Sequence, residues 1–136
     1  MKKLLSFSLV LMAALSLAAS LAEVEKITLD ALKKDQDKYN EKVVEVTGFV
    51  ASFQQKTSQR GNKYFKFILR SVKGSSESAS ANIYGQNEPT FELKDGLKVT
   101  VTGTYRKEKV IGDFTYKNEI DCTVKKDKPF GIKEAK

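Results

Sequence analysis

The chain has 136 residues, of which 24 are Lys or Arg and 17 are Asp or Glu, so its formal net charge at pH 7 is +7. It contains no histidine and a single cysteine. This composition excludes histidine general bases, Ser-His-Asp and Cys-His sites, imidazole metal ligands and an internal disulfide. A basic chain of this size permits an anionic partner without requiring one.

The first 22 residues predict a signal peptide that is removed from the mature protein. Lys2 and Lys3 precede an uncharged stretch, and Ser20-Leu21-Ala22 places small residues at the −3 and −1 positions of a cleavage site. The apolar run is shorter than the roughly 20 residues that a membrane span needs. We therefore expect cleavage after Ala22, export to the periplasm or beyond, and no integral membrane span in the mature chain. Removal of two lysines leaves a net charge of +5, from 22 Lys and Arg and 17 Asp and Glu.

Residues 23–41 predict a short helical lead-in. Thr28 is a suitable N-cap for a helix from Thr28 to Lys38, and Leu29 and Leu32 form a partial apolar stripe. Because this helix is short and charged, we expect its stability to come from docking on the rest of the fold.

Two strands are predicted between Lys42 and Leu69. In the first, from Lys42 to Phe53, apolar residues alternate with polar or small ones, which is the pattern of a half-buried strand. Gly48 interrupts this strand, and a glycine there indicates a bulge or a sharp bend. The second strand places Phe65, Phe67 and Leu69 on its inner face.

Three further strands follow. The third runs from Ala79 to Gly85 and leads into an irregular segment, where Phe91 and Leu93 are expected to close the open end of a barrel. The fourth runs from Leu97 to Arg106, ahead of a basic turn at 107–112, and the fifth from about Phe114 to Val124. The single cysteine, Cys122, falls on the apolar side of the fifth strand, which favours a buried thiol. Residues 126–136 are charged and predict a loose tail.

Five strands with a glycine bend in the first and a variable segment between the third and fourth are typical of the OB-fold, a five-stranded Greek-key barrel. Apolar and glycine positions at Gly48 and Val50, 57–69, Ile83 and Tyr84, and 97–103 resemble OB-fold nucleic-acid-binding domains of the tRNA-anticodon-binding type. The resemblance covers Lys42 to Val124 and implies an all-β fold there, so the predicted OB-fold barrel is residues 42–125. It specifies the fold better than the ligand, because its motifs are patterns of apolar positions.

Ligands of OB-folds lie across strands two and three, framed by the strand 1–2 and 4–5 loops. Aromatic rings that stack on bases, interspersed with cations that neutralise phosphates, would suit a single-stranded nucleic acid or another anionic polymer. The candidate ligand-binding residues are Lys56, Arg60, Lys63, Tyr64, Lys66, Arg70, Tyr84, Arg106, Lys107, Lys109 and Tyr116, with Lys117 as an extension.

Two alternatives stay open at this point. Lysine-rich loops also keep small exported domains soluble, and an exported OB-fold could instead bind an envelope protein or an oligosaccharide, with no nucleic-acid role. An enzyme is not expected. Asp113, Glu119 and Asp121 cluster near the fifth strand, but their spacing matches neither a Ca²⁺ loop nor a nuclease signature, and alternating acids are usually the solvated face of a strand. No cofactor or metal is expected, and the sequence leaves the oligomeric state open.

Overall fold

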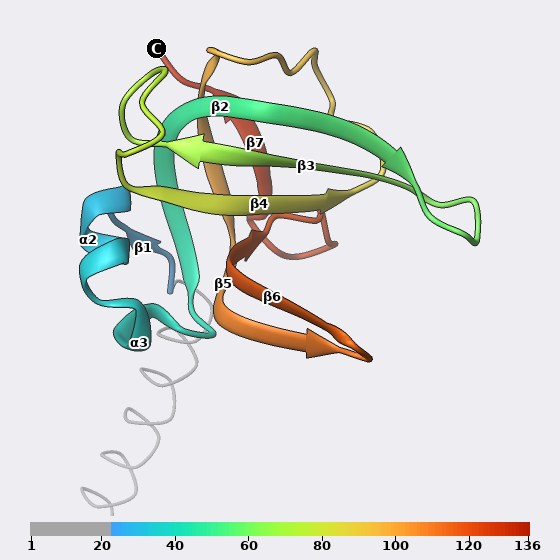
Figure 1. Ribbon diagram of the computed structural model, residues 1–136, viewed down its shortest axis with the longest axis horizontal. Helices are drawn as coiled ribbons and strands as arrows, with labels where there is room; N and C mark the ends of the chain where they lie inside the picture. Colours follow the sequence, from blue (N-terminus) through green and yellow to red (C-terminus); the bar gives the residue numbers. More distant parts are fainter. Residues whose placement is uncertain (1–22) are drawn as a thin grey trace, which may run out of the picture.

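A computed structural model describes residues 23–136 (Figure 1). The predicted signal peptide, residues 1–22, lies outside the described residues. The described part is mostly β-sheet with two short helices. Its elements are β1 (Glu25–Lys26), α2 (Leu29–Lys34), α3 (Gln36–Tyr39), β2 (Val43–Thr57), β3 (Lys63–Arg70), β4 (Ser80–Gln86), β5 (Lys98–Ile111), β6 (Phe114–Asp121) and β7 (Gly131–Glu134).

The strand pairings return to their starting point. Strand β2 pairs antiparallel with β3, β3 with β4, β5 with β6, and β5 with β2, while β4 and β6 pair in parallel. The circuit therefore runs β2–β3–β4–β6–β5–β2. This arrangement is an OB-like all-β fold, as the sequence pattern predicts.

Strand β2 bends because its two halves pair with different partners (Figure 1). Residues 43–49 pair with β5, and residues 49–57 pair with β3. Gly48 lies where the partner changes, and a Cβ there would sit 2.6 Å from the carbonyl oxygen of Arg70. The bulge itself lies further along, between Ala51 and Gln54, where Ser52 has a φ of 53°. Gly48 thus permits close approach at the bend, which is one of the two features predicted there, whereas the bulge lies at Ser52 and not at Gly48.

The core lies inside the circuit and is closed by the helix at one end. Alternate residues of β3 (Phe65, Phe67 and Leu69) are buried, as predicted. Helix α2 adds Leu29 and Leu32, and its N-cap Thr28 accepts a hydrogen bond from the Ala31 N–H at 3.0 Å. This docking provides the burial that so short a helix needs. From the irregular β4–β5 connection, Leu93 is buried in the core and Phe91 packs against it.

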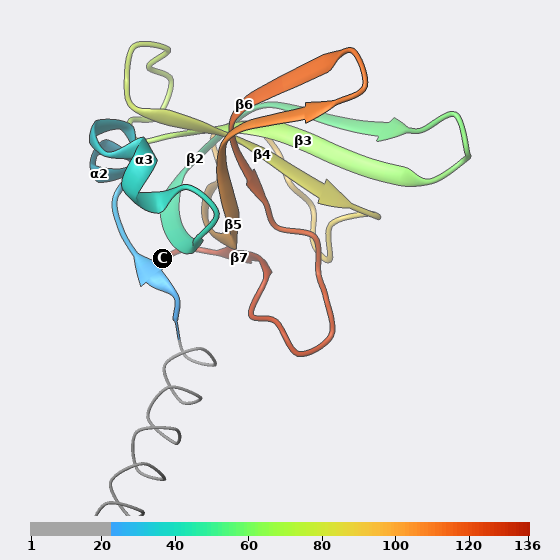
Figure 2. The same ribbon diagram turned by 90° about the horizontal axis from the view of Figure 1, so that it is seen from below.

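Two long hairpins, β2–β3 and β5–β6, extend on the side of the molecule away from α2 and α3 (Figures 1 and 2). The second differs from the sequence prediction. Residues 107–111, expected to form a basic turn, continue β5, and the turn is only Gly112–Asp113. The Ile111–Phe114 pair closes the ladder, because β-branched and aromatic residues sustain strand pairing although Lys107 and Lys109 precede them.

The C-terminal segment is not the loose tail that its charge predicted. Gly131–Glu134 form β7, which pairs antiparallel with residues 99–102 of β5, and Ile132 packs against the core. At the other end of the described chain, Glu25–Lys26 form β1, which pairs in parallel with β2. Both strands cover edges that β2 and β5 would otherwise expose, and this edge pairing outweighs the local charge.

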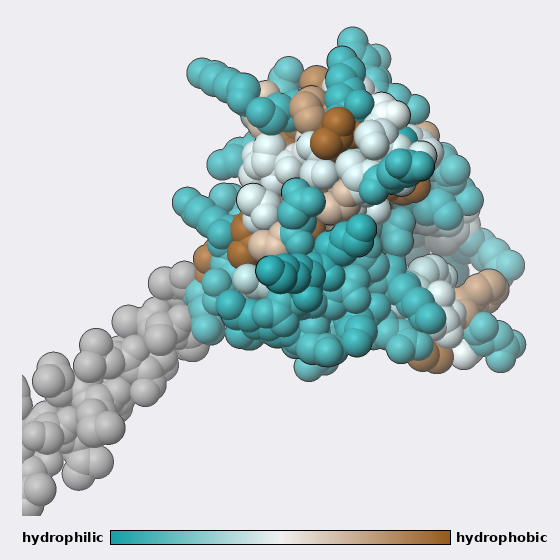
Figure 3. Space-filling view, turned by 60° about the vertical axis from the view of Figure 1, so that its left-hand side comes forward, coloured by the Kyte–Doolittle hydropathy of each residue, from teal (hydrophilic) through white to brown (hydrophobic). Residues whose placement is uncertain are grey.

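On the face shown in Figure 3, hydrophilic residues dominate and hydrophobic ones form small, separate groups. No helix within residues 23–136 is long and apolar enough to cross a membrane.

Candidate functional site

A groove of about 790 Å³ lies between the two hairpins, over the outer face of β3 and β4. Residues from β2, β3, β4, β5 and β6 line it. Five of the predicted ligand-binding residues are among them, namely Tyr64, Lys66, Tyr84, Lys109 and Tyr116. Lys117, the predicted extension, also lines the groove. The groove thus occupies the surface that the OB-fold resemblance implies.

The floor of the groove follows from strand alternation. Because Phe65 and Phe67 face inward, the intervening Lys66 and the preceding Tyr64 face outward. The register places Lys66 directly opposite Tyr84 on β4. The rings of Tyr64 and Tyr84 lie side by side, with centroids 5.8 Å apart and planes tilted by 39°. Two neighbouring strands thereby present a paired aromatic surface to the groove.

Lys109 connects the β5–β6 hairpin to this floor. Its ammonium donates a 2.9 Å hydrogen bond to the Glu119 carboxylate. The same nitrogen lies 5.5 Å from the ring centroid of Tyr84 and 5.6 Å from that of Tyr116. Both distances are within the range of cation–π attraction. The positive charge of Lys109 is therefore already compensated inside the protein.

A partly buried hydrogen-bond network fixes the base of the same hairpin. The Tyr105 hydroxyl donates to Asn118 Oδ1 at 2.8 Å, and Asn118 Nδ2 donates to the Ser80 carbonyl at 2.8 Å. Burial raises the pKa of Tyr105, so this hydroxyl remains a donor across the neutral range. Asn118, at a φ of 54°, thus ties β6 to β5 and β4. The hairpin therefore leaves the rest of the sheet in a defined direction.

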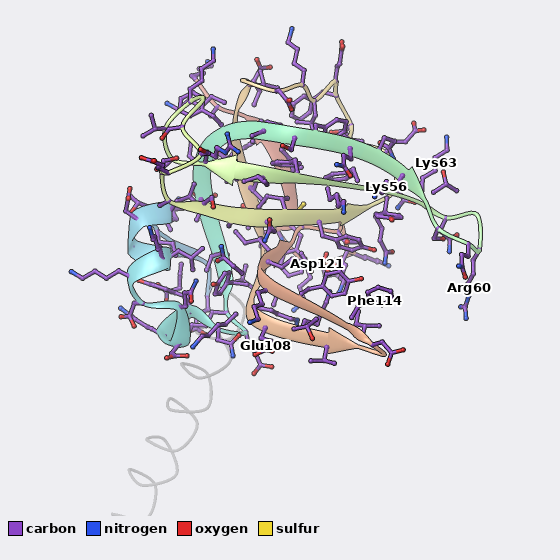
Figure 4. The ribbon with its side chains drawn as sticks, viewed as in Figure 1. Lys56, Arg60, Lys63, Glu108, Phe114 and Asp121 are labelled. Atoms are coloured by element: carbon purple, nitrogen blue, oxygen red, sulfur yellow. The ribbon has the colours of Figure 1, made fainter. Side chains whose placement is uncertain are left out.

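The other six predicted residues lie outside the groove: Lys56, Arg60, Lys63, Arg70, Arg106 and Lys107. Lys56, Arg60 and Lys63 belong to the β2–β3 hairpin, with Arg60 in its end loop (Figure 4). Three of the six are in exposed ion pairs: Lys63–Glu88 at 2.6 Å, Arg106–Glu41 at 3.4 Å and Lys107–Asp37 at 2.9 Å. The hydrogen bond that Lys107 donates to Asp37 raises the pKa of Lys107, and the one that Lys63 donates to Glu88 lowers the pKa of Glu88. Lys107 thus pairs with helix α3, and Arg106 pairs with the turn that follows α3. Lys107 can reach α3 because it continues strand β5 instead of projecting from a loop.

Two groove residues contradict the sequence interpretation of β6 as having an acidic solvated face. Glu119 is only 8% exposed and is ion-paired with Lys109. Asp121 is half-buried and accepts hydrogen bonds from the Thr123 backbone N–H at 3.0 Å and its hydroxyl at 2.6 Å. Parallel pairing of β6 with β4 brings both acids into the groove. The alternation of residues in β6 did not indicate that these acids are buried, because alternation does not reveal which strand lies next to β6.

The apolar end of the β5–β6 hairpin was not predicted either. Val110, Ile111 and Phe114 are each more than half exposed, and Phe114 is the most exposed at 68%. Ile111 lines the groove, whereas Phe114, at the start of β6 (Figure 4), is not among the residues that line it. The sequence signal was present, as three large apolar residues around a Gly-Asp turn. It was obscured by the expectation that residues 107–112 formed a loop.

Cys122 is buried, as predicted, at 2% exposure. Burial raises the pKa of its thiol to about 12, and the nearby Asp121 carboxylate adds to the shift. Within residues 23–136, no group of three or more Cys, Asp and Glu side chains is placed to hold a metal ion.

Comparisons with known proteins bear on the fold. No protein-family model matches the chain, and no curated protein matches its sequence significantly. Among solved structures, the chain is similar to the crystal structure of yeast Stn1 and Ten1, with a TM-score of 0.53 at 10% sequence identity. The match covers 85% of this chain and 64% of that one, so the protein spans less than two thirds of that chain's length. At this identity the likeness shows a shared OB-like fold.

Proposed function

We propose that the protein is an exported, non-enzymatic OB-fold module that binds single-stranded nucleic acid in the groove between its two hairpins. The observation that carries the proposal is the paired aromatic surface of Tyr64 and Tyr84, which faces Tyr116 across Lys109. Bases stack on exposed rings with little dependence on sequence. Lys66 and Lys117 supply exposed cations on the strands at either side of β4.

We also propose that the five circuit strands form a closed barrel of the tRNA-anticodon-binding type, in a protein that is exported. The circuit of pairings supports a closed five-stranded barrel, and the apolar pattern from Gly48 to Gly103 supports the tRNA-anticodon-binding type. The N-terminal pattern of two lysines, an apolar stretch and small residues supports export with cleavage after Ala22.

A binding role without catalysis fits the acids of the groove. Glu119 is neutralised by Lys109, and Asp121 accepts two hydrogen bonds from Thr123. Asp113 lies in the hairpin turn, remote along the strand from Asp121. These carboxylates have structural partners or are far apart, so they are poorly arranged for shared acid–base work.

The test is fluorescence anisotropy of a labelled, mixed-sequence single-stranded oligonucleotide titrated with residues 23–136, at about 50 and 200 mM salt. We expect Tyr84→Ala to weaken binding by about 1–3 kcal/mol, or roughly 5- to 150-fold. Tyr84→Phe is the matched control, because it keeps the ring and should retain most of the affinity. Equal affinities for the alanine variant and the unaltered protein, with matching melting temperatures, would exclude stacking on this surface.

A protein-interaction module of the cell envelope is the second candidate, and the apolar end of the β5–β6 hairpin favours it. Exposed Val110, Ile111 and Phe114 form the kind of apolar patch that protein partners cover. Such a complex would respond weakly to salt, whereas phosphate binding weakens steeply as salt rises. Phe114→Ala should then abolish capture of the envelope partner in a pull-down, and Val72→Ala, which truncates a similarly exposed residue (56%) in the β3–β4 loop, should not.

A further inference from the structure

One of the three lysines that line the groove is already ion-paired within the protein. Lys66, Lys109 and Lys117 line the groove together with the acids Glu119 and Asp121. The side chain of Lys109 is 25% exposed and that of its partner Glu119 is 10% exposed, so this ion pair is the shielded one. The remaining cations, Lys66 and Lys117, are exposed.

Moving Lys109 onto a phosphate would be costly. The Glu119 carboxylate would lose its 2.9 Å partner at a site that is nearly closed to water, and an unpaired buried charge is strongly unfavourable. The ammonium would also leave the faces of Tyr84 and Tyr116. A lysine with these three contacts is better suited to ordering the rings than to binding an external anion.

We propose that Lys109 is a positioning residue that holds Tyr84 and Tyr116 in place as a stacking platform, so that bases enter the groove and phosphates contact only its exposed cations. This inference rests on the proposed nucleic-acid function and deepens it. It reassigns Lys109, which the sequence placed among the phosphate contacts. It also assigns a role to Glu119, which anchors the lysine between the two rings.

The salt dependence of binding distinguishes a lysine that contacts a phosphate from a lysine that only positions the tyrosine rings. For single strands, the logarithm of the binding constant falls by about 0.7 per decade of salt for each phosphate contact. We expect Lys66→Met to reduce this slope by about 0.7. Lys109→Met should leave the slope unchanged but weaken binding roughly three- to tenfold at every salt concentration, because the rings must then be ordered on binding. Lys109→Arg, which keeps the charge, should recover most of the loss.

Glu119→Gln provides the reciprocal test. Neutralising the anchor releases the Lys109 charge to phosphates, so the slope should become steeper by about 0.7. A slope that drops in Lys109→Met as it does in Lys66→Met, or stays constant in Glu119→Gln, would overturn the positioning role. Melting temperatures of all variants identify any that fail to fold.

A measurement without nucleic acid keeps this inference separate from the proposed function. We expect NMR relaxation of the Tyr84 and Tyr116 rings to show greater mobility in Lys109→Met than in the unaltered protein or in Lys66→Met. Unchanged ring mobility would overturn the positioning role even if nucleic acid binds. Absence of binding by the unaltered protein would instead overturn the proposed function, while the ring measurement would still decide what Lys109 does.

Discussion

At the scale of the residue, glycines mark the places where one strand crosses close to another. A Cβ at Gly103 would lie 2.2 Å from the backbone carbonyl oxygen of Asp121, and one at Gly85 would lie 2.4 Å from the ring of Phe65. Both distances are far below normal contact. The obstacles differ, because a ring can rotate or shift, whereas a carbonyl in a paired strand is fixed by its ladder.

We therefore expect Gly103→Ala to destabilise the protein more than Gly85→Ala. Overpacking a core typically costs about 1–3 kcal/mol, and Gly103→Ala should lie at or above the upper end of that range. Urea denaturation of the two variants beside the unaltered protein measures the difference. An equal or smaller loss for Gly103→Ala would mean that β5 and β6 can move apart without disturbing the fold.

The buried thiol predicts a specific pH dependence. The pKa of Cys122 is about 12 in the folded protein against an ordinary value of 9.0. Between these two pH values the thiol is protonated in the folded protein and ionised in the unfolded chain. Its contribution to stability is complete below pH 9 and is lost as the pH rises from 9 towards 12. The slope of this loss is at most about 1.4 kcal/mol per pH unit.

The comparison with Cys122→Ala isolates this effect, because the lysines and tyrosines of both proteins titrate alike. We expect the free energy of unfolding of the unaltered protein to fall faster than that of the variant above pH 9. A difference that stays constant up to pH 11 would contradict the raised pKa. At pH 8, the thiol should react with a disulfide reagent only after denaturant is added.

At the scale of the element, short strands at the chain ends complete the sheet. Strand β7 has only four residues, yet it pairs with β5 along residues 99–102, and Ala135 donates a 3.0 Å backbone hydrogen bond to the Lys98 carbonyl. Ile132 contributes its side chain to the core. The stability of this element comes from docking, because a four-residue strand has little of its own.

Ile132→Ala should therefore destabilise the whole protein by about 1–3 kcal/mol, in the lower part of the range for Ile to Ala because Ile132 is only half-buried. Lys133→Ala, one residue along and exposed, is the matched control and should change stability by less than about 0.5 kcal/mol. Thermal unfolding of both variants tests this. Similar melting temperatures for the two would indicate that β7 is not part of the cooperative unit.

At the scale of the whole molecule, residues 23–136 share one core. The buried residues of α2, the five circuit strands and the β4–β5 connection form a single cluster, to which Ile132 of β7 is joined. Unfolding should therefore be a single cooperative transition. Far-UV circular dichroism and fluorescence of the five tyrosines, in a chain without tryptophan, should report the same midpoint. Two separated midpoints would show that the hairpins or the terminal strands unfold independently.

The inner faces of the strands, the helix N-cap at Thr28 and the buried position of Cys122 are predictable from the amino-acid order, because alternation and capping are local properties of the chain. The amino-acid order also located Tyr64, Lys66 and Tyr84 on one outer face. The partner of each cation, in contrast, depends on how the strands pack. Lys107 pairs with Asp37 because β5 continues past residue 106, and Lys109 pairs with Glu119 because β6 folds back along β5. Such pairings join residues that no local pattern relates, so the same lysine-rich stretch could be read as a phosphate-binding loop until the strands were placed side by side.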